Sequence, residues 1–169
     1  MTLIPEYRFD TFDEASADFL VSIGVKGIIL DIDNTLEPYE NALPGERVIS
    51  WLASLKERGI SASFVSNNGR DRVMLFNGKL KLPAYYKAGK PFTKNIRRAM
   101  VRMGTSRDDT ILMGDQIFTD VLAAHLEGIR AVLVPPIKDK RDPITRFKRI
   151  LERPILEKYE RKSKNASRL

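Results

Sequence analysis

Two carboxylates, Asp31 and Asp33, lie two residues apart at the end of an apolar run over residues 27–30. Along a strand, side chains at i and i+2 lie on one face, so both carboxylates can converge on one ligand where the chain turns. Asn34 and Thr35 follow directly and can provide that turn together with amide donors. The pattern indicates phosphate and metal chemistry. Its alternative is an ordinary Asx turn that closes a buried strand.

Later segments supply residues that could complete such a site. Ser66 and Asn67 follow an apolar run, Lys90 lies in an Ala-Gly-Lys-Pro stretch, and Asp115 and Asp120 follow a further apolar run. Carboxylates bind hard cations such as Mg²⁺, and a lysine with that cation neutralises a phosphoryl group. One carboxylate can then attack phosphorus while another holds a proton. Singly each segment is a common turn or loop, but their order predicts a phosphoryl-transfer site.

The elements that must position these residues alternate between strand and helix patterns. This alternation predicts an α/β fold, a three-layer Rossmann-like parallel sheet, with the polar residues at the carboxyl ends of its strands. Glycines directly follow the predicted helices over 13–23, 46–58, 93–103 and 119–127 and can end each of them. The predicted strands are 25–30, 60–65, 84–87, 110–113 and 131–134, and the predicted helices are 13–23, 46–58, 71–77, 93–103 and 119–127.

Composition narrows the classes of protein and site. The 169 residues suit one core, and 43% hydrophobic with 30% charged residues is typical of a globular protein. The chain has no cysteine and a single histidine, His125, which excludes disulfides, thiolate metal sites and histidine cages. We expect His125 to be a surface or packing residue and Trp51 to belong to the core. Without a signal pattern or an apolar span, the expected location is cytoplasmic.

The net charge of +7 lies at one end of the chain. Residues 1–136 hold 17 basic and 17 acidic side chains, whereas residues 137–169 hold 12 and 5. We therefore expect a catalytic domain over 1–136 and a basic helical tail over 137–169 that is not an independent domain. In the tail, an apolar stripe lies beside basic residues, and Pro154 is expected to kink or end the helix. The stripe consists of Ile144, Phe147, Ile150 and Leu151.

Two interpretations of this tail stay open. A basic amphipathic helix suits an anionic membrane, which would place the protein at the inner membrane face as a peripheral protein. In the alternative, the helix packs on the domain and the last residues form a solvated basic tail.

The motifs resemble those of the haloacid dehalogenase (HAD) superfamily of aspartyl-phosphate phosphatases. All four motifs of that superfamily occur in order across residues 27–120. The matching segments are Leu30-Asp31-Ile32-Asp33-Asn34-Thr35-Leu36, Phe64-Val65-Ser66-Asn67, Lys90, and Gly114-Asp115-Gln116-Ile117-Phe118-Thr119-Asp120.

The resemblance implies a role for each matching residue. Asp31 would be the nucleophile and Asp33 the general acid and base. Asn34, Ser66, Asn67 and Lys90 would bind the phosphoryl group or steady it. Mg²⁺ would be held by Asp31, Asp115 and the carbonyl of Asp33. Asp120 would act on these ligands without binding the cation itself.

The resemblance also bears on the substrate. Neither the segment from Asp33 to Ser66 nor that from Asn67 to Lys90 has room for a cap domain, as in the capless subfamily III. The chain is most similar to the YqeG-type branch of subfamily IIIA, which is related to phosphatidylglycerophosphate phosphatases. We therefore expect a phosphorylated substrate, with this lipid as the sharpest candidate and another phosphorylated metabolite or macromolecule as an alternative. The other alternative is an RNA- or ribosome-binding module with a vestigial site, and an oligomer is compatible with either.

Overall fold

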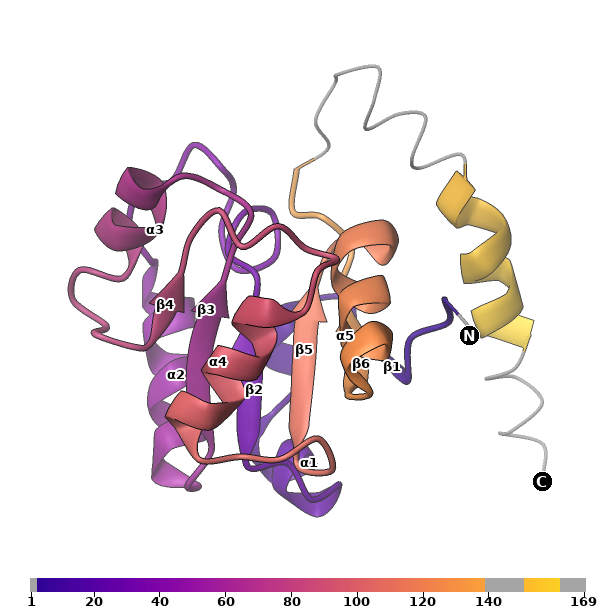
Figure 1. Ribbon diagram of the computed structural model, residues 1–169, viewed down its shortest axis with the longest axis horizontal. Helices are drawn as coiled ribbons and strands as arrows, with labels where there is room; N and C mark the ends of the chain where they lie inside the picture. The colour runs from indigo at the N-terminus through magenta and orange to yellow at the C-terminus, as the bar shows by residue number, and fades with distance from the viewer. Residues whose placement is uncertain (1–2, 139–150, 162–169) are drawn as a thin grey trace.

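The computed structural model describes residues 3–138 and 151–161. Their core is a six-stranded sheet in the order β1-β6-β5-β2-β3-β4, in which every neighbouring pair is parallel (Figure 1). Because β2 lies between β3 and β5, the chain brings its first and fourth motifs to adjacent strand ends. The strands are β1 Tyr7–Arg8, β2 Gly27–Leu30, β3 Ser61–Val65, β4 Ala84–Tyr85, β5 Thr110–Gly114 and β6 Arg130–Leu133.

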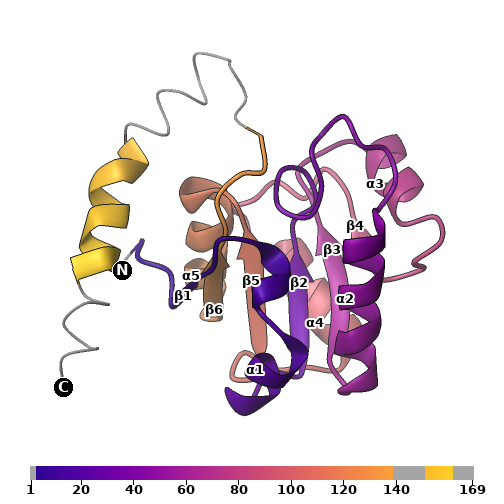
Figure 2. The ribbon, with the colours of Figure 1, turned by 180° about the vertical axis from the view of Figure 1, so that it is seen from behind.

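Helices cover both faces of the sheet, as Figures 1 and 2 show from opposite sides. Successive residues of β2 point to opposite faces: Ile28 and Leu30 join the cluster under α1 and α2, and Ile29 joins the cluster under α4 and α5. This confirms the predicted three-layer α/β fold. The helices are α1 Ala17–Ser22, α2 Glu46–Glu57, α3 Arg70–Phe76, α4 Lys94–Met103 and α5 Leu122–Glu127.

The apolar spacing of α2 shows why these helices form where predicted. Its residues Val48, Trp51, Leu52 and Leu55 recur every three or four positions and are all buried. Trp51 belongs to the core as predicted, and its indole N–H donates to the carbonyl of Ala15 over 3.0 Å.

Two predicted helices differ in detail, and one strand was not predicted. The edge strand β1 was not predicted, since two residues carry no usable periodicity. The predicted helix over 13–23 is a 3₁₀ turn, η1 Phe12–Glu14, followed by α1, because Ser16 caps α1 by accepting from the amide of Phe19 over 3.2 Å. The predicted helix over 119–127 begins earlier, as the π-helical turn η2 Ile117–Val121, and continues as α5.

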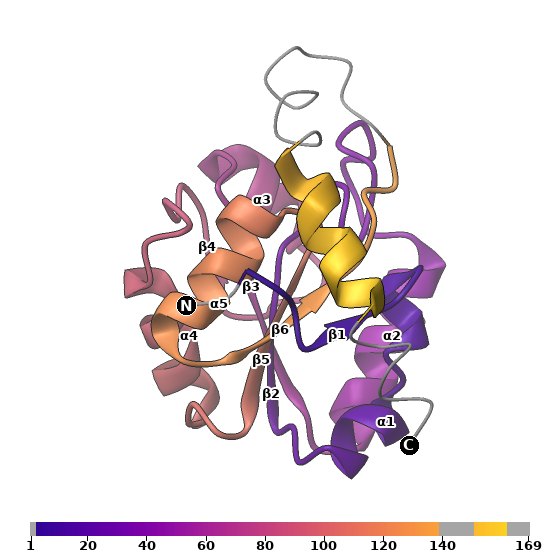
Figure 3. The same cartoon turned by 90° about the vertical axis from the view of Figure 1, so that its right-hand side faces the viewer.

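Residues 151–161 form a helix beside the β1 edge of the sheet (Figure 3). Pro154 was expected to kink or end a helix. It does not end one, since residues on both sides of Pro154 are helical. Ile155 and Leu156 pack against the cluster under α4 and α5, while Leu151 is 45% exposed. Residues 144–150 of the predicted stripe lie outside the described residues. Within the described parts of the chain, no helix is long and apolar enough to cross a membrane.

Candidate active site

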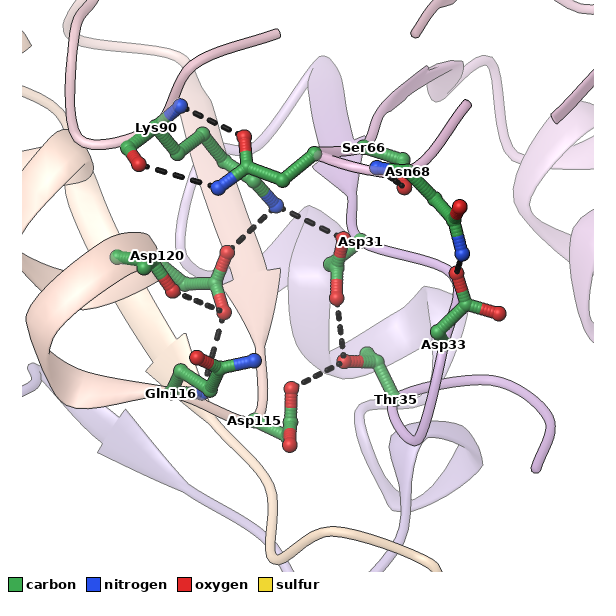
Figure 4. Close-up of polar contacts among 11 residues, drawn as sticks. Asp31, Asp33, Thr35, Ser66, Asn68, Lys90, Asp115, Gln116 and Asp120 are labelled. Carbon is green, nitrogen blue, oxygen red and sulfur yellow. Dashed lines mark hydrogen bonds and ion pairs between the residues drawn. The ribbon is translucent and has the colours of Figure 1, made fainter. Parts of the chain in front are cut away.

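The carboxyl ends of the strands surround a cavity of about 440 Å³. Every residue that the sequence predicted for the site lies in its wall except Asp120, which lies directly behind it (Figure 4). The lining residues are Asp31, Asp33, Asn34, Tyr39, Ser66, Asn67, Asn68, Lys90, Asp115, Gln116, Thr119, Lys138 and Glu152.

A buried lysine joins two carboxylates at the base of this cavity. The Lys90 ammonium donates to Asp31 Oδ1 over 2.8 Å and to Asp120 Oδ1 over 2.6 Å. The exposed fractions of the Lys90, Asp31 and Asp120 side chains are 2%, 10% and 1%. Ion pairs so poorly exposed to water are short, strong and rigid, so the position of Asp31 is fixed.

Burial decides the protonation behaviour of this group. It raises the pKa of Asp31 to about 6, although the charge of Lys90 opposes the shift. Burial also disfavours the charged form of Lys90, but the attraction of Asp120 and Asp31 outweighs it and raises the pKa of Lys90. At neutral pH, Asp31 is therefore a carboxylate, the form that can attack phosphorus, and Lys90 remains a cation.

Three carboxylates are close enough to share a cation. Oxygens of Asp31, Asp115 and Asp120 lie within 4.8 Å of one another, and all three residues are buried. A donor set made only of oxygens suits a hard divalent cation, whose charge would offset the excess of carboxylates over Lys90. The oxygens of Asp120 already accept from Lys90 and from the amide of Gln116, so Asp31 and Asp115 are the better placed ligands.

Thr35 links the two candidate ligands and was not predicted as a site residue. Its hydroxyl lies 3.5 Å from Asp31 Oδ2 and 3.4 Å from Asp115 Oδ1. Thr35 therefore lies between the two candidate ligands, and its single hydroxyl proton can be donated to either carboxylate.

The predicted phosphate-binding residues form the opposite wall. The Ser66 hydroxyl accepts from the amide of Asn68 over 3.1 Å and is nearly fully buried. The Asn67 side chain makes two hydrogen bonds with the backbone of Lys90: it accepts from the N–H over 2.7 Å and donates to the carbonyl over 3.1 Å. In this arrangement the Asn67 side chain positions Lys90. Asn34 takes a left-handed conformation, φ 63°, that an asparagine tolerates, and turns the chain after Asp33.

The Asp33 carboxylate points away from the group formed by Asp31, Asp115 and Asp120. Its two oxygens accept hydrogen bonds from residues of the segment after β3: Arg72 Nε donates over 2.8 Å and Asn68 Nδ2 over 2.9 Å. Asp31 and Asp33 therefore occupy different environments.

Sequence patterns did not predict that the C-terminal segment would reach the cavity. Glu152 is 3% exposed and accepts from the amide of Ile117 over 3.2 Å, at the start of η2. Ile137 donates its backbone N–H to the carbonyl of Asn34 over 2.9 Å, and Lys138 pairs with Glu40. Lys138 and Glu152, which lie on either side of residues 139–150, thus both contribute to the wall of the cavity.

Sequence comparisons identify the family. A family model described as HAD-hydrolase-like matches residues 87–150. "Probable phosphatase YqeG" of Bacillus subtilis (strain 168) is 43% identical over 138 residues, which cover 82% of this chain and 80% of that protein. The chain belongs to the HAD superfamily. The family inferred from the four motifs is thereby confirmed.

Solved structures share the HAD fold at low sequence identity. The cobalt-bound deoxy-D-mannose-octulosonate 8-phosphate phosphatase of Haemophilus influenzae superposes with a TM-score of 0.52 at 16% identity, covering 66% of this chain and 68% of that one. A protein of Listeria monocytogenes serotype 4b superposes with a TM-score of 0.53 at 12% identity, covering 70% and 85%. At these identities the similarity supports the fold alone.

Gly114, in the fourth HAD motif, allows Asp120 to approach the sheet. A Cβ atom at Gly114 would lie 2.2 Å from the Asp120 carboxyl carbon, so Gly114→Ala must displace that side chain. We expect kcat/KM to fall at least roughly tenfold, since Lys90 loses a fixed partner and small displacements at a site are costly. Gly69→Ala is the control, because a Cβ there meets nothing within 4 Å. Equal kinetics of the two variants would contradict this expectation.

Glu152 is expected to fasten the C-terminal helix to the HAD core. In Glu152→Ala, the buried amide of Ile117 loses its acceptor, a loss of about 1–3 kcal/mol. We expect hydrogen exchange at Ile117 to accelerate at least roughly tenfold, together with exchange in the helix over 151–161. Glu157→Ala, an exposed change in the same helix, should leave both rates unchanged. Similar exchange in both variants would show that Glu152 does not hold the helix.

Proposed function

We propose that this HAD-type phosphatase is a Mg²⁺-dependent phosphomonoester hydrolase that works through a phosphoaspartate at Asp31. The observation that carries the proposal is the buried Asp31 carboxylate, fixed by Lys90 at 2.8 Å on the wall of a cavity that Asp33, Ser66 and Asp115 share. A nucleophile, a proton carrier, a phosphate-binding hydroxyl and a cation-binding carboxylate are the parts that this reaction needs.

The reaction has two halves in this proposal. The Asp31 carboxylate attacks phosphorus, the bond to the leaving oxygen breaks, and Asp33 gives that oxygen a proton. Water then attacks phosphorus, Asp33 takes its proton, and the bond to Asp31 breaks to release phosphate.

Charge on the phosphoryl group must be offset in both halves. Mg²⁺, held by Asp31, Asp115 and the Asp33 carbonyl, would neutralise this charge. Lys90, Ser66 and the separate turns at Asn34 and at Asn67 would bind the remaining phosphoryl oxygens, while Asp120 holds Lys90 in place.

The substrate must be one that a site without a cap domain can take. Between β2 and β3 the chain forms a loop and α2, and between β3 and Lys90 it forms α3 and β4, so neither insertion is a folded cap. With the YqeG-type similarity, this supports assignment to subfamily IIIA and a bulky or surface-bound substrate. Phosphatidylglycerophosphate is the candidate that we propose to test first.

A substrate panel with Mg²⁺ or with a chelator tests the proposal. It should contain an aryl phosphate, soluble phosphomonoesters and phosphatidylglycerophosphate in vesicles. We expect Mg²⁺-dependent phosphate release by wild type and none by Asp31→Asn. Hydrolysis of soluble esters without cleavage of the lipid would overturn the lipid assignment alone. Absence of any hydrolysis, together with salt-sensitive RNA retention, would favour the binding-module alternative.

A further inference from the structure

Arg72 binds the carboxylate of Asp33, which transfers a proton in both halves of the proposed reaction. Its Nε donates to Asp33 Oδ1 over 2.8 Å. Its Nη2 lies 2.8 Å from the same oxygen and adds charge attraction without a directed hydrogen bond. The side chains of Arg72 and Asp33 are only 11% and 12% exposed, so water screens this ion pair poorly.

Arg72 is itself fixed from several sides. Its Nη1 donates to the carbonyl of Ala42 over 3.0 Å. Its guanidinium carbon lies 5.3 Å from the ring centre of Phe76 and 5.9 Å from that of Tyr39, distances typical of cation–π contacts. A cation so firmly held sets the orientation of its partner instead of following it.

The geometry around Asp33 is that of a proton acceptor. Arg72 is a donor only, and Asn68 donates its amide N–H to the second oxygen over 2.9 Å. Donors from two side chains thus hold both oxygens of the Asp33 carboxylate in one orientation. In the second half of the proposed reaction, that carboxylate must accept a proton from water, and there the orientation of its oxygens decides whether they can reach the water.

We propose that Arg72 is a positioning residue for the second half of the reaction, in which it orients the Asp33 carboxylate to take a proton from the attacking water. The proposal rests on the function proposed above. In that step a bond forms between the water oxygen and phosphorus, the water proton passes to Asp33, and the phosphorus–Asp31 bond breaks with its electron pair returning to Asp31.

Arg72→Met separates the two halves kinetically. Since kcat/KM covers only events up to the first irreversible step, it should stay within about threefold of wild type, while kcat falls roughly 10- to 100-fold. With p-nitrophenyl phosphate, pre-steady-state kinetics should show a burst of nitrophenol close to one per site, since the phosphoenzyme accumulates. Arg72→Lys keeps the charge and should recover part of kcat.

Two matched variants complete the experiment. Arg70→Met removes an exposed arginine from the same helix and should retain the wild-type kcat and show no new burst. Asp33→Asn should lower kcat and kcat/KM together, since it removes both proton transfers. A parallel loss of kcat and kcat/KM in Arg72→Met without a burst, or no loss at all, would overturn the role of Arg72. Wild-type kinetics in Asp33→Asn would instead overturn the proposed role of Asp33, and the inference with it.

Discussion

Asp31→Asn is expected to lower phosphomonoester turnover at least roughly 1,000-fold, because its amide cannot form the proposed phosphoaspartate. The same change is expected to stabilise the protein at neutral pH, which separates loss of chemistry from loss of fold. Measuring turnover with Mg²⁺ and unfolding in a chelator on the same preparations would establish both effects.

The gain in stability follows from the protonation of Asp31. Burial raises its pKa in the folded protein to about 6, from an ordinary value of 3.8. A carboxyl whose folded pKa is raised contributes stability that is present below its unfolded pKa and is lost as pH rises through its folded pKa. Asparagine carries no charge to desolvate, so the variant should avoid that loss.

Denaturant titrations across this pH window give the measurement. We expect the free energies of unfolding of variant and wild type to differ little near pH 4 and to diverge by on the order of 1–2 kcal/mol near pH 8, in favour of the variant. A variant that loses stability relative to wild type as pH rises would contradict the raised pKa.

Lys90→Met is expected to have the largest effect on stability. It leaves Asp31 and Asp120 buried without their shared cation, and breaking a buried ion pair on one side costs about 3–5 kcal/mol. The free energy of unfolding at neutral pH in a chelator is the quantity to measure. Lys94→Met, an exposed change on α4, is the control and should shift stability by less than about 0.5 kcal/mol.

A second substitution tests the cause of this loss. If the orphaned charges destabilise Lys90→Met, then adding Asp120→Asn should recover part of the stability. Activity should not return, since no side chain replaces the charge that Lys90 is proposed to place at the phosphoryl group. Additive losses in the double variant would show that Lys90 acts through packing instead.

The sequence predicted the elements with the clearest periodicity and could not predict contacts between distant parts of the chain. β2, β3 and β5 were predictable because each is a short apolar run followed by polar turn residues. The short strand β1 was not, because its two residues owe their conformation to pairing with β6, which lies far along the chain.

The same reasoning applies to the site. The residues in the four motifs were predictable, while Arg72 and Glu152 were not, because both act over long sequence separations. Each still leaves a local signal, a charge on an apolar helix face: Arg72 precedes Phe76 by four positions, and Glu152 precedes Leu156 by four. The sequence does not say which carboxylate or amide such a charge meets.

The central place of β2 in the sheet affects how the protein is made. Thr35 follows β2 and Asp115 follows β5, and their side-chain oxygens lie 3.4 Å apart although the two residues are 80 positions apart in the sequence. At about 5–20 residues per second, roughly 4–16 s of synthesis separate them, and until then one edge of β2 lacks its permanent neighbour. A nascent chain that stops before β5 therefore exposes an apolar strand edge and lacks Asp115.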